Sequence, residues 1–226
     1  MNEKFADFLP AELQFENETQ KNEVATTIKE FYFGNRPVSE ETILNYVDYF
    51  TDILFAYPML RVANMRVSKG DTIYFHEYSF VDENTPFVPH STVRGAGHCE
   101  QLTIVADDLY LLGPTPNHTE EFEVMRESMR KLWLNFITTG NPTPEDSTLP
   151  TWSPVSGYAS PFMSLNQSIG LQQLSLLEAR ARFWDSIYEN HYRLPIAPAV
   201  PAPVPDSASI LNASLLIIVA LVVLTL

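Results

Sequence analysis

The sequence of 226 residues is long enough to bury a sizeable core, as one large domain or as two small ones. Its composition, 45% hydrophobic and 12% aromatic, is that of a globular protein and excludes a largely disordered chain. The formal net charge of −14 argues against a nucleic-acid-binding surface, which needs clustered lysine and arginine. Cys99 is the only cysteine, so no disulfide can form within these residues.

Helical patterns occupy the first part of the chain. We expect a short helix from Asn22 to Phe33 and a second helix capped by Ser39. Apolar residues in the second helix recur at steps of 4, 3, 4 and 3 and form one apolar stripe. Pro58 interrupts the pattern and is expected to open a further helix that runs to Val67. The stripe consists of Ile43, Val47, Phe50, Leu54 and Tyr57.

The middle of the chain carries one strong strand pattern. The run from Thr72 to Phe80 is aromatic and β-branched, and a loop with two prolines follows it. Further on, we expect a long helix over residues 120–138, a short strand from Phe162 to Leu165 and a last helix over residues 174–192. The expected apolar face of the long helix consists of Met125, Met129, Leu132, Trp133 and Phe136.

The segment from Gly95 to Leu102 points most clearly to chemistry. A histidine in a loop of small residues behind an aromatic strand is where a serine hydrolase keeps its general base. Such a base needs a nucleophile and an orienting acid. The Gly-x-Ser-x-Gly turn that presents a nucleophilic serine requires two glycines four residues apart. No two of the eight glycines in this sequence have that spacing, so these residues carry only part of an enzyme.

Six motifs follow one another along residues 1–192 and resemble one known family in order. They are Asp-Tyr-Phe-Thr-Asp-Ile-Leu-Phe-Ala-Tyr at 48–57, the strand at 73–80, the histidine loop at 95–102, Leu-Trp-Leu-Asn-Phe-Ile-Thr-Thr-Gly-Asn-Pro at 132–142, Leu-Pro-Thr-Trp at 149–152 and Arg-Phe-Trp at 182–184. Together they resemble roughly the last third of the type B carboxylesterases, which include cholinesterases and insect esterases. The resemblance implies an α/β fold, the C-terminal part of an α/β-hydrolase. It would be mostly helical, with a late central-sheet strand from about Thr72 to Phe80, and would need no cofactor.

The resemblance also implies a role for His98, which matches the catalytic histidine of the family. His98 would serve a Ser–Glu/Asp–His triad that hydrolyses small-molecule carboxylic esters. Only the histidine of this triad lies in these residues, so we expect the chain alone to be inactive. The family has glycine directly after this histidine and an acidic residue three positions beyond it, whereas Cys99 and Gln101 stand here. We expect Cys99 to be a small structural thiol and not a nucleophile.

Two further functional hypotheses remain open at this point. The first is a non-catalytic, cholinesterase-like cell-surface protein that binds partners; the changes around His98 are compatible with it, although the retained histidine argues against it. The second is a truncated product without function. A detached third of a hydrolase domain is also expected to expose apolar faces. An upstream Gly-x-Ser-x-Gly would select the esterase, and an upstream region without the serine would select the binding protein.

The C-terminal residues indicate a membrane anchor. We expect a Pro/Ala-rich linker over residues 193–209 and a hydrophobic tail over residues 210–226. The apolar run is short for a membrane-spanning helix, and no lysine or arginine follows Arg193. We therefore favour a glycosylphosphatidylinositol attachment signal, with Asp206 or Ser207 as the attachment residue, over a transmembrane anchor. This signal predicts a protein on the extracellular face of the plasma membrane, or a secreted one.

Possible glycosylation sites agree with a secreted protein. Asn-x-Ser/Thr sequons begin at Asn17, Asn117, Asn166 and Asn212. Residues 1–30 lack the basic start and the apolar run of a signal peptide, so we expect that the front of the protein is missing.

Overall fold

Helices form about half of the described part of the chain. The structure, a computed structural model, describes residues 1–106, 118–157, 160–173 and 175–193. The chain divides into two compact units, Met1–Tyr192 and Arg193–Leu226, and every element described below belongs to the first. The expected linker and hydrophobic tail lie outside the described residues, apart from Arg193. Within the described ranges, no helix has both the length and the apolar character that a bilayer crossing requires.

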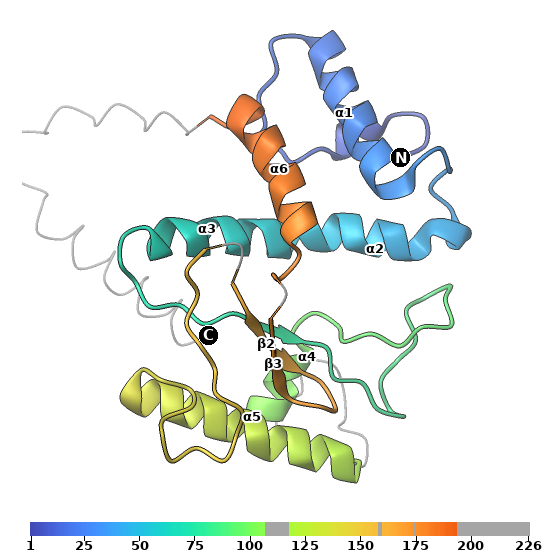
Figure 1. The fold of residues 1–226 in the computed structure, drawn as a ribbon. Coiled ribbons are helices and arrows are strands. Elements are labelled where there is room, and N and C mark those ends of the chain that lie inside the picture. Colours follow the sequence, from blue (N-terminus) through green and yellow to red (C-terminus); the bar gives the residue numbers. More distant parts are fainter. Residues whose placement is uncertain (107–117, 158–159, 174, 194–226) are drawn as a thin grey trace, which may run out of the picture. The chain divides into compact units, whose positions relative to one another are not determined.

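Helical segments alone precede β1, and they include a continuous helical rod; the short strands all lie in the later part of the chain, among further helices (Figure 1). The rod consists of α2, a π-helical segment η3 and α3. Two 3-10 helices, η1 at Phe5–Phe8 and η2 at Glu40–Thr42, precede α1 and α2. In chain order, the other elements are α1 Glu18–Phe33, α2 Ile43–Thr51, η3 Asp52–Ala56, α3 Tyr57–Val67, β1 His76–Tyr78, α4 Glu100–Val105, α5 Glu120–Thr139, β2 Phe162–Leu165, β3 Gly170–Gln172 and α6 Glu178–His191.

Helix α1 begins before its predicted start at Asn22. The side-chain oxygen of Asn17 accepts a hydrogen bond from the backbone N–H of Gln20 at 3.0 Å and caps the helix. The first turn is polar, so apolar periodicity does not reveal it. The end at Phe33 is as predicted, because Gly34 adopts a φ of 59° and its N–H donates to a carbonyl of the last turn.

The apolar stripe predicted along the rod does not lie on one buried face. Tyr57 is 2% exposed, whereas Leu54 is 59% and Val47 38% exposed. Leu54 and Tyr57 are three residues apart and would share a face of an α-helix. Leu54 lies within η3, however, and the wider π-helical turn rotates the two side chains apart. Pro58 stands in the first turn of α3, as predicted.

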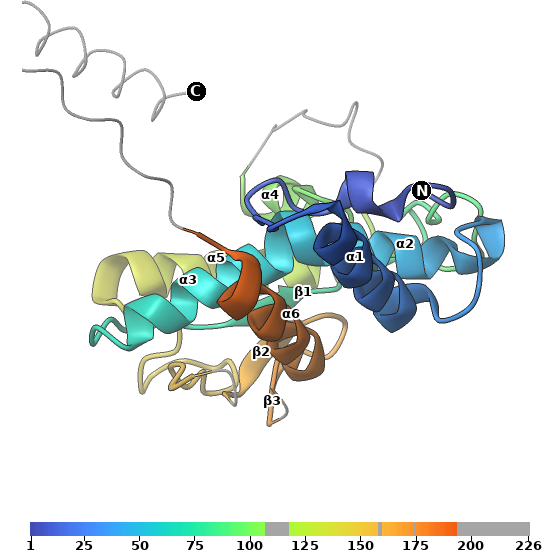
Figure 2. The same cartoon turned by 90° about the horizontal axis from the view of Figure 1, so that it is seen from above.

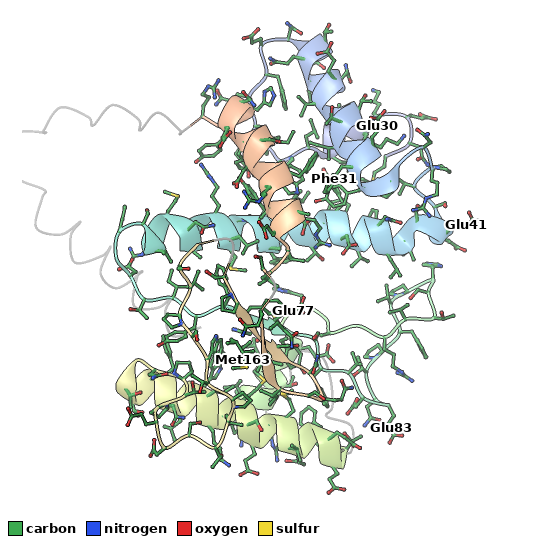
Figure 3. All side chains as sticks on the ribbon, viewed as in Figure 1. Glu30, Phe31, Glu41, Glu77, Glu83 and Met163 are labelled. Carbon is green, nitrogen blue, oxygen red and sulfur yellow. The ribbon has the colours of Figure 1, made fainter. Side chains whose placement is uncertain are left out.

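One hydrophobic core joins α1, the rod and α6. Ile28, Tyr49 and Trp184 are completely buried in it. Phe31 of α1 stacks on Phe183 of α6, with ring centroids 3.9 Å apart and planes at 4° (Figure 3). Figure 1 shows α1 and α6 on the same side of the rod and at a steep angle to it, and Figure 2 shows the two helices beside each other. Burial of Ile28, Tyr49 and Trp184 away from water stabilises this region.

A buried polar network lies inside this core, centred on Asp52 of η3. The Asp52 carboxylate is 1% exposed and accepts hydrogen bonds from the hydroxyl of Tyr32 at 2.5 Å and from Nη2 of Arg180 at 2.7 Å. Nη1 of Arg180 also pairs with Asp48 at 2.7 Å. Trp184 Nε1 donates to the hydroxyl of Tyr32 at 2.6 Å. Burial raises the pKa of Asp52, while its bonds to Tyr32 and Arg180 act in the opposite direction. The network connects α1, the rod and α6.

The sheet in the described residues has three short strands in the order β1–β2–β3. β1 pairs with β2 in parallel, with His76 opposite Met163, and β2 pairs with β3 in antiparallel fashion. β2 has the predicted bounds, and β3 carries no clear strand pattern in the sequence. Figure 3 shows Met163 of β2 among the side chains between the sheet and α5, where it is completely buried.

The predicted strand from Thr72 to Phe80 is correct in place but too long, because only His76–Tyr78 forms β1. The backbone before β1 bonds mainly to a loop, although the Phe75 carbonyl also accepts from the N–H of Met163 in β2 at 2.9 Å. The Ile73 carbonyl accepts from the N–H of Val155 at 2.7 Å, and the Phe75 carbonyl accepts from Trp152 Nε1 at 3.0 Å. These bonds satisfy the backbone without extending the sheet.

The last two long helices differ from prediction mainly at their ends and faces. In α5, Met125, Met129 and Leu132 are buried as expected, but Phe136 is 44% exposed. Thr119 caps the start of α5 and Gly140, with a φ of 75°, follows its end. α6 begins at Glu178, later than predicted, because Leu177 adopts a left-handed conformation with a φ of 53°.

Candidate active site

His98 lies at the end of the long loop after β1, directly before helix α4. The sequence predicts this loop but not the helix. Glu100 closes the loop, because its side chain accepts a hydrogen bond from the backbone N–H of Gly97. Between them, Cys99 has a φ of 65° and a ψ of 1°, the left-handed conformation. The result is a tight turn that presents the exposed imidazole of His98 at the start of α4.

The ring of Phe55 packs on the imidazole of His98. Their centroids are 4.5 Å apart and their planes meet at 29°, so the two rings are stacked. Phe55 belongs to η3, more than forty residues earlier in the chain, and is 47% exposed. Sequence reasoning did not single out Phe55, because the α-helical period places its neighbour Leu54 on the apolar stripe. The π-helical turn is what brings Phe55 to the histidine.

Gln101 connects the candidate site to the sheet. It occupies the position where the family resemblance predicts an acidic side chain, and its Oε1 lies 3.2 Å from Nε2 of His76 in β1. Burial lowers the pKa of His76, so the neutral imidazole is favoured there. The edges of Trp133 and Trp152 surround His76, with centroid distances of 5.4 and 5.8 Å. Gln101 therefore has a structural partner, and His76 is a packed residue.

The nitrogens of His98 are not occupied by the described residues. Across residues 1–106, 118–157, 160–173 and 175–193, no hydrogen bond or ion pair joins the His98 imidazole to a carboxylate or a hydroxyl. Two acidic side chains of this region are paired with other residues instead: Asp71 with Arg66 at 2.5 Å, and Glu40 with His90 at 3.0 Å. A search of the same ranges finds no cluster of histidine, cysteine, aspartate and glutamate that could hold a metal ion. The described site is therefore a single histidine without its reaction partners.

The expected glycosylation and lipid-attachment residues are only partly described. Asn17 is exposed, and its side-chain oxygen caps α1. Asn166 is half-buried, and its Nδ2 donates to the hydroxyl of Ser164 at 3.0 Å. A glycan at Asn166 would replace this bond, whereas Asn17 Nδ2 has no such partner in the described chain. Asn117, Asp206 and Ser207 lie outside the described residues.

The rod presents an exposed apolar face, which includes Phe55. Its side chains recur at helical spacing along α2, η3 and α3. A face of this extent on a soluble protein usually marks a surface that contacts another polypeptide. Its members, each at least 38% exposed, are Leu44, Val47, Leu54, Phe55, Met59, Val62 and Met65.

Comparison with known proteins identifies the family of the chain. Residues 2–184 match the model of the carboxylesterase family. The chain belongs to this family. The match confirms the family predicted from the sequence motifs. Together with a structure that is about half helical and has a small mixed sheet, it confirms a partial α/β-hydrolase fold.

Individual carboxylesterases align with most of this chain but with a minor part of their own length. Esterase E4 of Myzus persicae is 31% identical over 170 residues, which are 71% of this chain and 30% of the esterase. Carboxylesterase 5A of Homo sapiens is 29% identical over 164 residues, 69% of this chain and 27% of its own length. Pyrethroid hydrolase Ces2a of Mus musculus is 28% identical over 162 residues, which are 72% of this chain and 28% of the hydrolase. The chain therefore spans less than a third of the length of these relatives.

The conformation of Cys99 explains why a carboxylesterase would favour glycine at this position, and it leads to a prediction. A side chain at positive φ is strained, whereas glycine is not. We expect Cys99→Gly to raise the free energy of unfolding by about 1 kcal/mol. Cys99→Ala is the control, because it removes the thiol but keeps the Cβ. Chemical denaturation of both variants measures the difference, and equal stabilities would show that residue 99 is not left-handed in solution.

Proposed function

We propose that this chain supplies the histidine-bearing part of a serine carboxylesterase, in which His98 is the general base. The imidazole would take the proton from a serine hydroxyl as the serine attacks the ester carbonyl, and would return it to the leaving alcohol. The serine, the acidic member of the triad and the oxyanion donors would come from polypeptide outside these 226 residues. The substrate would be a small-molecule carboxylic ester, and the 226 residues alone would be inactive.

The observation that carries this proposal is the presentation of His98 within a carboxylesterase sequence. A general base must reach the nucleophile with one ring nitrogen and an orienting acid with the other. His98 is exposed on a tight turn, its ring face rests on Phe55, and the described residues leave both of its nitrogens free. A histidine with a purely structural role would be expected to engage a local partner, as His76 does with Gln101.

The exposed apolar face of the rod supports the same proposal. It lies on the helices that include Phe55, so a polypeptide covering the face would also approach His98. We propose that the serine-bearing part of the carboxylesterase domain covers this face. Its burial would remove several large apolar side chains from water, each worth about 1.5–3 kcal/mol when fully buried.

A chimeric enzyme tests the proposed function. The C-terminal part of Esterase E4 that corresponds to the family match of this chain is replaced by residues 2–184, and the hydrolysis of short-chain carboxylic esters is measured. We expect turnover well above that of Esterase E4 lacking the stretch. A soluble, monodisperse chimera without esterase activity would contradict the proposal.

A non-catalytic binding protein of the same family is the second candidate. The substitutions at the histidine loop favour it, because Cys99 holds a strained conformation and Gln101 replaces an expected acid. Under this alternative, the folded chimera would lack esterase activity, and its activity would not return when Cys99→Gly and Gln101→Glu are introduced together. Restoration of activity by these two changes would favour a weakened esterase.

The remaining proposals concern location. We propose a hydrolase part over residues 1–192, a linker over 193–209 and a glycosylphosphatidylinositol signal over 210–226, with attachment at Asp206 or Ser207. Phosphatidylinositol-specific phospholipase C should then release the native protein from membranes, and retention would favour a transmembrane tail. We also propose Asn17, Asn117 and Asn166 as glycosylation sites; a mass unchanged by endoglycosidase would exclude them.

A further inference from the structure

The geometry points to Phe55 as a positioning residue for His98. This inference rests on the proposed function, because it assigns Phe55 a task only if His98 acts as a base. Phe55 covers one face of the imidazole at 4.5 Å, with 29° between the planes. The two nitrogens lie in the ring plane, so stacking limits the tilt of the ring without occupying either of them. Phe55 would set the orientation of the His98 imidazole and leave both of its nitrogens available for proton transfer.

Among the described residues, Phe55 is the one whose ring stacks against the His98 imidazole. Within the ranges that the structure describes, no hydrogen bond or ion pair involves the imidazole, and Phe55 is the aromatic ring in contact with it. The backbone on either side is well defined, since Glu100 bonds to the N–H of Gly97 and α4 begins at Glu100. The backbone turn therefore fixes the Cα position of His98, while the side-chain angle depends on Phe55.

Phe55 is itself held by the buried network on the other side of η3. Asp52 is 1% exposed and is bonded to Tyr32 and Arg180, whereas Phe55, three residues later, is 47% exposed. In an α-helix, residues three apart share a face. The π-helical turn separates them, so that Asp52 anchors in the core while Phe55 reaches His98. A π-helical turn inside a longer helix is a frequent feature of functional sites. Here it places the ring of Phe55 against the imidazole of His98.

Kinetics of the chimera test the positioning role. We expect Phe55→Leu to lower kcat about 10- to 100-fold, the scale of a misplaced catalytic group, with little change in KM. Phe55→Tyr keeps the stacked ring and should retain most of the kcat. Phe31→Leu is the matched control, because Phe31 is a similarly exposed phenylalanine stacked on Phe183, away from the histidine. An unchanged kcat in Phe55→Leu, or an equal loss in Phe31→Leu, would overturn the inference.

A spectroscopic measurement tests the contact independently of esterase activity. In the complete 226-residue chain, the ring current of Phe55 should shift the carbon-bound protons of His98 upfield in the NMR spectrum. Phe55→Leu should abolish this shift, and Phe31→Leu should preserve it. A His98 signal that does not respond to Phe55→Leu would overturn the inference. Loss of the proposed function would instead be seen as full turnover in His98→Ala, so the two failures are distinguishable.

Discussion

Replacing His98 by alanine in the chimera is expected to lower ester turnover about 10⁴- to 10⁶-fold, the scale of losing the base of a serine triad. Without the imidazole, the serine hydroxyl has no acceptor for its proton, and the leaving alcohol has no donor. The remaining rate would come from substrate binding and oxyanion stabilisation alone. The measurement is kcat/KM for a short-chain ester, compared between the chimera and the His98→Ala chimera.

A second histidine provides the control for this result. His90 lies in the same long loop, is exposed and faces Glu40 at 3.0 Å. His90→Ala removes an imidazole of similar exposure without touching the candidate site, so turnover should not change. Equal activities of the His98→Ala and unmodified chimeras would contradict the assignment of His98 as the base.

Removing Arg180 is expected to produce the largest loss of stability. Arg180→Met leaves the Asp52 carboxylate buried at 1% exposure without its cationic partner. Breaking a buried pair in this way typically lowers the free energy of unfolding by about 3–5 kcal/mol. The remaining bond from Tyr32 does not neutralise the charge. Denaturant unfolding of the complete chain, at neutral pH, measures the effect.

The loss in free energy of unfolding caused by Arg180→Met should depend on pH, and this dependence identifies its cause. Burial raises the pKa of Asp52 above its usual range, so the ionised carboxylate depends on its bonds to Tyr32 and Arg180. A group with a raised pKa contributes stability that is present below its unfolded pKa, about 3.9 for aspartate, and that is lost as the pH rises through the folded pKa. The deficit should therefore be largest at neutral pH and smaller below about pH 4.

Arg182→Met is the matched control for the stability prediction. Arg182 lies two residues further along α6, and its side chain is 64% exposed and pairs with Glu178 one turn away. Such a pair contributes about 0.3–0.5 kcal/mol. A loss as large in Arg182→Met as in Arg180→Met would show that the buried network is not responsible.

Several elements could be predicted from the sequence because a few neighbouring residues determine where each of them begins and ends. The helix predicted over residues 120–138 is α5, which Thr119 caps at its start and which ends before Gly140. The strand Phe162–Leu165 has the predicted bounds. The position of His98 in a loop also follows from the small residues around it. In each case a few neighbouring residues determine the conformation.

Other features depend on tertiary contacts that a local pattern does not contain. The backbone before β1 leaves the sheet at Ile73, whose carbonyl accepts from the N–H of Val155. The π-helical turn at Asp52–Ala56 accompanies the anchoring of Asp52 by Tyr32 and Arg180, which are distant in sequence. This turn changes the helical phase, exposes Leu54 and brings Phe55 to His98. The sequence motifs single out His98 as a candidate base, but they do not predict that the ring of Phe55 contacts it.

The most direct test of the central claim is the sequence of the transcript upstream of the codon for Met1. The claim is that these residues form the histidine-bearing part of a serine carboxylesterase. It predicts an open reading frame upstream that encodes a Gly-x-Ser-x-Gly motif and, between that motif and Met1, an acidic residue for the triad. An in-frame stop codon immediately upstream, or an open frame in which the serine is replaced, would contradict it.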